Sequence, residues 1–208
     1  VITKTGSGDL ILDRAGSNLG SLLFDVQSGA LAGVHAGAFA GAGLQLSGGE
    51  LLLSSPGGDI VYDHAVAITS NSVLTAGRIG DGVAGPLNLS LSGNLTFLGD
   101  QTLALRSTDD YKLILPGEIV GNGTLDIKGG SVTLSDTNFN AVTLSSGTLT
   151  VTNLLDVNAL VQNGGAFVQA GASKDLTVRT TLTLVQVLDM PGANLDVSRL
   201  FYTSPRPR

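Results

Sequence analysis

Short apolar–polar–apolar runs return at a nearly constant interval between residues 121 and 168, with Gly, Asn or Ser between them. The paired runs begin at Leu125 and Val132, at Val142 and Leu149, and at Leu160 and Phe167. Each run therefore returns after 17 residues and then after 18 residues. A constant period of this length indicates a repeat architecture, in which each unit buries its apolar face against its neighbours.

The alternation within each run predicts strands, because alternate side chains of a strand share one face. Frequent Gly-rich turns leave no room for helices between the runs. A third, weaker apolar cluster lies between the paired runs, at Phe139 and again at Leu154, Leu155 and Val157. Three short strands in each repeat are typical of a parallel β-helix, so we expect an all-β solenoid.

The composition agrees with one domain built from strands and turns. The chain has 208 residues, of which 29 are Gly and only 13% are charged, and no shift in composition divides it. An apolar content of 42% supplies more buriable surface than a disordered tract carries. We predict a single β-helical domain at 1–200, followed by a tail at 201–208 whose prolines cannot continue a hydrogen-bonded ladder. The chain begins in mid-pattern, which indicates a fragment or a processed form. The sequence also shows no amphipathic capping helix at either end, so we expect a section of a longer solenoid or a subunit that stacks on copies of itself.

Charge and cysteine content exclude several classes of function. The net charge is −6 and Lys and Arg are scattered singly, so we predict no nucleic-acid partner. No Cys is present, which excludes disulfides, zinc–cysteine sites and thiol nucleophiles. The sequence contains no run of 18 apolar residues, so it predicts no transmembrane helix.

The beginning of the chain resembles a known family motif. Residues 2–12 carry a lysine and a Gly-x-Gly ahead of an apolar-x-apolar strand, as in the passenger-associated β-strand repeat of autotransporters. Asn18 and Gly20 stand where that repeat has its turn, and residues 27–31 stand where it closes with a Gly-x-Leu strand. About 30 residues resemble the repeat well.

A second, looser copy of the motif covers 129–134, Asn138 and 146–149. Its Val132-to-Leu149 interval is 17 residues, whereas Leu10 to Leu31 is 21, so the coils are expected to contain about 17–22 residues. The resemblance implies a secreted, right-handed parallel β-helix in a large surface protein of a bacterium with an outer membrane.

Candidate chemistry is sparse. Asp63 and His64, with Asp59 nearby, have the side chains of an acid–base group for polysaccharide cleavage, but a solvated turn is the favoured interpretation. Asp109 and Asp110 have the carboxylates that calcium binds, but a hydrophilic loop is again favoured. We therefore predict no catalytic, cofactor-binding or metal-binding residues, no cofactor, and no enzymatic activity.

Two segments interrupt the strand pattern. The Gly/Ala-rich stretch at 30–49 is expected to form a loop or tight coil rather than a helix, because its Gly content disfavours helix. The polar residues 106–112 predict either a hairpin turn or a loop that projects from its coil. Residues 33–43 and 107–111 are the loops expected to meet a partner.

The leading hypothesis is a non-enzymatic, extracellular structural or adhesive β-helix segment of a bacterial surface protein. Its expected partners are copies of itself, neighbouring solenoid coils, and glycans or proteins of a host or surface. In one version of this hypothesis the segment assembles with its own copies into a fibre or layer. The first alternative is a carbohydrate-active β-helix enzyme, but the absence of Trp offers little aromatic platform for sugars. The second alternative is a phage or viral fibre segment.

Overall fold

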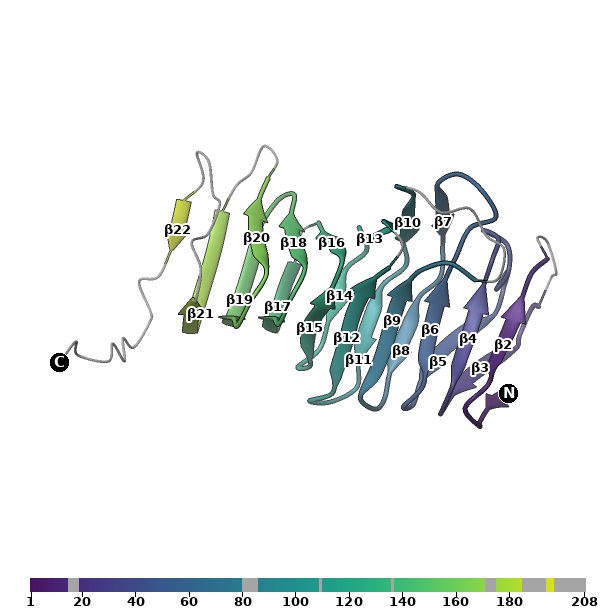
Figure 1. Cartoon of the computed structure of the whole chain (residues 1–208). Coiled ribbons are helices and arrows are strands. Elements are labelled where there is room, and N and C mark those ends of the chain that lie inside the picture. Colours follow the sequence, from purple (N-terminus) through teal and green to yellow (C-terminus); the bar gives the residue numbers. More distant parts are fainter. Residues whose placement is uncertain are drawn as a thin grey trace.

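The computed structural model describes residues 1–14, 19–79, 86–108, 110–135, 137–170, 175–184 and 194–196. These residues form a parallel β-solenoid of about eight turns, with no helix among them (Figure 1). The predicted tail at 201–208 and Asn18 of the first motif copy lie outside the described residues. No described segment is a helix long and apolar enough to cross a membrane.

The strands of the solenoid form three parallel sheets, one for each side of the coil. Sheet A contains, in order, β1 (Ile2–Lys4), β3 (Leu23–Val26), β5 (Gly43–Leu46), β8 (Val66–Ile68), β11 (Leu95–Phe97) and β14 (Ile119–Val120). Sheet B contains β2 (Asp9–Leu12), β4 (Ala30–Gly33), β6 (Glu50–Leu53), β9 (Ser72–Ala76), β12 (Thr102–Ser107), β15 (Thr124–Gly129), β17 (Thr137–Leu144), β19 (Leu155–Gln162), β21 (Asp175–Leu184) and β22 (Asn194–Asp196). Sheet C contains β7 (Ile60–Tyr62), β10 (Asn88–Leu91), β13 (Lys112–Leu115), β16 (Ser131–Leu134), β18 (Thr148–Val151) and β20 (Ala166–Gln169).

The register of the strands confirms the repeat interval predicted from the sequence. Leu125 is the partner of Val142, which is the partner of Leu160, along sheet B. Sheet C stacks Val132 on Leu149 on Phe167 in the same way. Phe139 of the third apolar cluster is the partner of Val157, but both lie in the long strands β17 and β19 of sheet B, so the expected third short strand is not separate in these coils. The apolar run and its spacing therefore define both the strand and the position on which it stacks.

Apolar ladders fill the inside of the coil. One ladder along sheet B runs through Leu10, Leu31, Leu51, Leu74, Leu105, Ile127 and Leu144, each the register partner of the next. All of these except Leu10, which lies in the first coil, are fully or almost fully buried. Each such side chain contributes about 1.5–3 kcal/mol to the free energy of folding. The interior is continuous because every coil supplies the same inward positions.

The predicted coil length of 17–22 residues is found near both ends of the solenoid, but coils in the middle contain more residues. Asn88 lies 29 residues after Asp59, its neighbour in the preceding coil. Arg106 lies 31 residues after Thr75, its register partner on sheet B. The extra residues lie between strands, where longer connections cost little closure entropy. The strand alternation predicts strand positions but not the length of the connections.

The Gly/Ala-rich segment forms neither a helix nor a projecting loop. Residues 34–42 form a turn in place of a sheet C strand, between β4 and β5. Ala38 and Phe39 in this turn are buried, and the Phe39 ring lies 5.8 Å from that of Tyr62. The loop predicted for 30–49 is therefore confirmed at 34–42, whereas 30–33 and 43–46 form strands β4 and β5. The turn folds over the solenoid interior, so the expectation that residues 33–43 project to meet a partner is wrong for its buried residues. Phe39 closes the interior on the side where the first coils have no sheet C strand in the described residues.

Tyr62 links this turn to the rest of the stack. Its hydroxyl is fully buried and lies within hydrogen-bond distance of two carbonyl oxygens, 2.7 Å from that of Gly33 and 2.6 Å from that of Ser54, which share its one proton. Burial raises the pKa of the Tyr62 phenol well above its usual value, because the charged phenolate would lose its hydration. The hydroxyl therefore stays a neutral hydrogen-bond donor.

Replacing Tyr62 by phenylalanine is expected to lower the free energy of unfolding by about 1–2 kcal/mol. The ring stays in place, but the Ser54 carbonyl loses this donor, whereas the Gly33 carbonyl still accepts from the Ser54 amide. Urea unfolding followed by circular dichroism measures the change. An unchanged midpoint would show that water replaces the hydroxyl and that the site is not closed.

Candidate functional site

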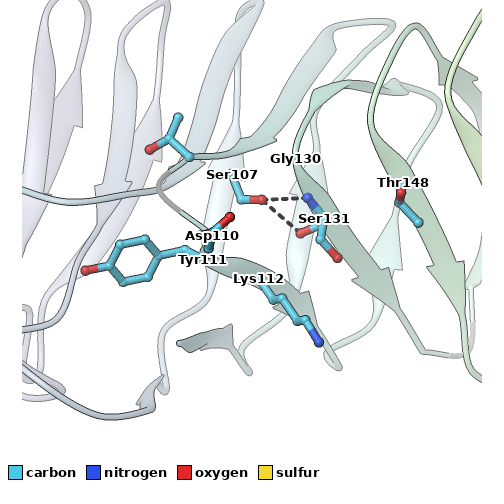
Figure 2. A pocket seen from close by; sticks show the side chains of 8 residues that line it. Ser107, Asp110, Tyr111, Lys112, Gly130, Ser131 and Thr148 are labelled. Carbon is cyan, nitrogen blue, oxygen red and sulfur yellow. Dashed lines mark hydrogen bonds between the residues drawn. The ribbon is translucent and has the colours of Figure 1, made fainter. Parts of the chain in front are cut away.

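A groove of about 470 Å³ lies at the corner between sheets B and C. We call it the corner groove; its lining comprises Ser107, Thr108, Asp110, Tyr111, Lys112, Gly130, Ser131 and Thr148. These residues come from the turn between β12 and β13 and from the starts of β16 and β18, so three successive coils contribute (Figure 2). The β12–β13 connection joins strands of two different sheets, which settles it as a corner loop and not a hairpin.

The floor of the corner groove is a close contact between two coils. The Ser107 hydroxyl accepts a hydrogen bond from the Ser131 amide at 2.7 Å and donates to the Ser131 carbonyl at 3.1 Å. Gly130 has a φ of +69°, and a Cβ there would lie 2.1 Å from the Ser107 carbonyl oxygen. Only glycine fits both the conformation and the space. The start of β16 is thereby held against the end of β12.

The turn that forms one wall is held by a buried aromatic side chain. Tyr111 is almost completely buried, and its amide donates to the Thr108 carbonyl at 3.0 Å. Asp110 has a φ of +64° and is, among the described residues, the one residue other than glycine with a positive φ. Aspartate tolerates this region better than most residues, although at a cost in conformational energy. Asp109, the other half of the predicted acidic pair, lies outside the described residues.

Lys112 begins β13 and its side chain is exposed. Figure 2 shows this side chain and the ring of Tyr111, the residue directly before β13, extending in opposite directions. The described structure contains no ion pair of Lys112. Its ammonium group therefore remains exposed beside the groove.

Cations on the outer face of sheet B are instead paired. The Arg106 guanidinium contacts both carboxylate oxygens of Glu50, at 3.0 and 3.1 Å, and its Nε donates to the Thr75 hydroxyl at 2.9 Å. Lys128 lies 2.7 Å from Asp126, and Arg179 pairs with Asp156. The Arg106 and Arg179 pairs join different coils, so they act on the stacking of the solenoid.

Asp59, Asp63 and His64 do not form an acid–base group. The Asp59 carboxylate accepts hydrogen bonds from the backbone and side-chain amides of Asn88, which lower the pKa of Asp59. Asp63 is exposed and accepts from the Ser92 hydroxyl at 3.2 Å. The His64 ring packs edge-on against Phe39 at 5.7 Å. The three side chains thus have separate surroundings. Asp59 and Asp63 are exposed, as the predicted solvated turn requires, whereas His64 packs on Phe39.

Lys4, the lysine of the first motif copy, is bound by backbone carbonyl groups. Lys4 ends β1, and its ammonium donates to the carbonyls of Thr5, Gly6 and Ser28 at 2.9–3.0 Å. Leu10 and Leu31, which the two strands of that motif supply, are register partners on sheet B. Within the described residues, no group of three or more His, Cys, Asp or Glu is arranged to hold a metal ion.

No protein-family model matches the chain, and searches of curated proteins and of solved structures found no match either. The family resemblance therefore stays an expectation drawn from the sequence.

Sequence reasoning identified residues 107–111 as a loop but missed Ser131 and Thr148. Both open a strand directly after a glycine, Gly130 or Gly147. Sheet C places Lys112, Ser131 and Thr148 in successive register positions. The recurring Gly-Ser and Gly-Thr pairs were the available signal, and the repeat interval between them indicated that they stack.

Proposed function

We propose that this chain is a non-enzymatic structural or adhesive segment of an extracellular bacterial surface protein of the autotransporter-like kind. In this proposal the stacked coils form a stiff rod that holds binding surfaces away from the cell. Ends of the rod that remain open associate with further coils or with copies of the chain, so that fibres or layers can form.

The observation that carries the proposal is the unbroken interior of the stack. Buried apolar side chains extend from Phe24 in β3 to Val178 in β21, within the described residues, as one cluster. A solenoid of this kind is stabilised by contacts between neighbouring coils, so its length can grow without a new type of core. Reach and stiffness follow directly from this construction.

The N-terminal end of the stack supports association. Strands β1 and β2 lie at the ends of their sheets and each pairs on one side among the described residues (Figure 1). Val1, Ile2 and Ile11 are exposed on this first coil. Unpaired backbone groups beside exposed apolar side chains are a template for pairing with another strand.

Concentration-dependent association of the purified chain tests the proposal. We expect sedimentation to show oligomers that grow with concentration, and electron microscopy to show filaments as wide as one solenoid. The double variant Ile2→Lys/Ile11→Lys is expected to remain monomeric, because lysine on an edge strand opposes pairing. Leu98→Lys, which changes an exposed leucine directly after β11, a central strand of sheet A, is the matched control and should assemble normally.

Monomers at every concentration, or filaments that the end variant forms as readily as the control, would contradict assembly through this end. Circular dichroism of each variant verifies that the solenoid is folded. The enzyme and phage-fibre alternatives stay hypotheses, and turnover of a polysaccharide by the purified chain would favour the first of them over our proposal.

A further inference from the structure

We propose that the corner groove binds a neutral, linear, hydroxyl-rich glycan that lies along the stacking axis. The inference rests on the proposed extracellular adhesive function and names the chemical class of its partner. Its evidence is the direction of the groove, its balance of charges, and the way in which its charged residues are held.

The groove follows the stacking direction of the coils. Lys112, Ser131 and Thr148 occupy successive register positions of β13, β16 and β18. Adjacent strands lie about 4.8 Å apart, so polar groups repeat at that interval along the axis. A linear ligand placed along the groove meets a new polar side chain at each coil, and a chain of repeating sugars offers hydroxyl groups in the same manner.

The described lining favours a polyhydroxylated ligand without net charge. Asp110 and Lys112 are its charged residues, and their opposite charges offset each other. The carboxylate accepts hydrogen bonds, the ammonium donates them, and the hydroxyls of Ser131 and Thr148 do both. A sugar hydroxyl also donates and accepts, so it can use every member of this set. A polyanion would place its charges beside the Asp110 carboxylate, which disfavours it.

The backbone at both charged residues is held in position before a ligand arrives. Asp110 is exposed at a positive φ of 64°, in a turn that the buried Tyr111 anchors. The Lys112 amide donates to the Leu87 carbonyl at 2.8 Å, which ties the start of β13 to the preceding coil. Residues kept in an unfavourable backbone region cluster at binding sites, where positioning offsets their conformational cost.

Nuclear magnetic resonance titration of the full chain tests the inference. The probes are cellohexaose, mannohexaose and chitohexaose, with hexagalacturonate as the charged comparison. We expect at least one neutral probe to shift the amide resonances of Lys112, Ser131 and Thr148 in a saturable way. The charged hexamer is expected to bind at least tenfold more weakly.

Three variants separate ligand contacts from structure. Asp110→Asn retains a side chain that tolerates positive φ but removes the charge, and is expected to weaken binding about tenfold. Thr148→Val keeps the shape, removes one hydroxyl and is expected to weaken binding several-fold. Thr150→Val is the matched control on the same strand, two residues from the groove lining, and should bind as the parent does.

The inference is overturned if no neutral probe shifts these resonances at millimolar concentration, if hexagalacturonate binds best, or if both groove variants bind like the Thr150→Val control. A different measurement shows whether the proposed non-enzymatic function fails. Cleavage of a bound probe, detected by mass spectrometry, would contradict a non-enzymatic role while leaving the groove intact as a glycan site. Filaments that form without glycan binding would support the proposed structural role and contradict only the proposal that the corner groove binds a glycan.

Discussion

Phe39→Ala is expected to lower the free energy of unfolding by about 3–5 kcal/mol. The side chain is fully buried, and its ring packs 5.8 Å from Tyr62 and 5.7 Å from His64. Alanine would leave a cavity at the place where the turn 34–42 closes the interior. Urea or thermal unfolding of the variant measures the loss.

The matched control for this cavity is Leu98→Ala. Leu98 is 65% exposed, so its truncation should change stability by less than about 0.5 kcal/mol. Equal effects of the two variants would mean that the turn 34–42 does not stay packed on the solenoid in solution. Phe39→Leu fills part of the same space and should fall between the parent and Phe39→Ala.

Gly123→Ala is expected to destabilise the solenoid by about 2–3 kcal/mol, although it adds only one methyl group. A Cβ at this position would lie 2.0 Å from Cδ1 of Phe97 and 2.7 Å from the Gln101 carbonyl oxygen. The Phe97 ring has little freedom to move, because it is buried and its centroid lies 4.9 Å from that of the Phe139 ring, at an interplanar angle of 46°. Overpacking would therefore push successive coils apart.

Gly8→Ala is the control for Gly123→Ala. A Cβ at Gly8 meets nothing within 4 Å and the residue has no positive φ, so the change should be neutral or slightly stabilising. A neutral effect at both positions would show that the corner between β14 and β15 is looser than the structure describes. In a solenoid such a defect acts mainly on adjoining coils, so hydrogen exchange should increase first around Phe97 and Phe139.

Strand positions and their stacking could be predicted because both depend on local pattern. Alternation at Leu125, Val132 and their repeats identifies inward positions, and a constant interval aligns them from coil to coil. The connections could not be predicted in the same way. The steps of 29 and 31 residues both span the connection between β9 and β10, whose length no periodic burial requirement fixes.

The candidate site was predictable only in part. The polar run at 106–112 indicates a loop, and the Asp109–Asp110 pair within it supplies carboxylates. Ser131 lies 24 residues after Ser107, and Thr148 lies a further coil away, so their meeting depends on the register of sheets B and C. Equally, Asp63 and His64 are adjacent in sequence but have different surroundings, one near Ser92 and the other against Phe39.

The sequence by itself determined the class of fold: short alternating runs at a regular interval bury their apolar face only by stacking, so a β-solenoid follows. Tertiary structure alone decided what the irregular segments do. Phe39 closes the interior, and the groove beside Lys112 forms from three coils, because these contacts join residues that the local pattern does not relate. Periodic burial is written into every repeat, whereas a closing turn or a groove arises once, from the packing of particular side chains.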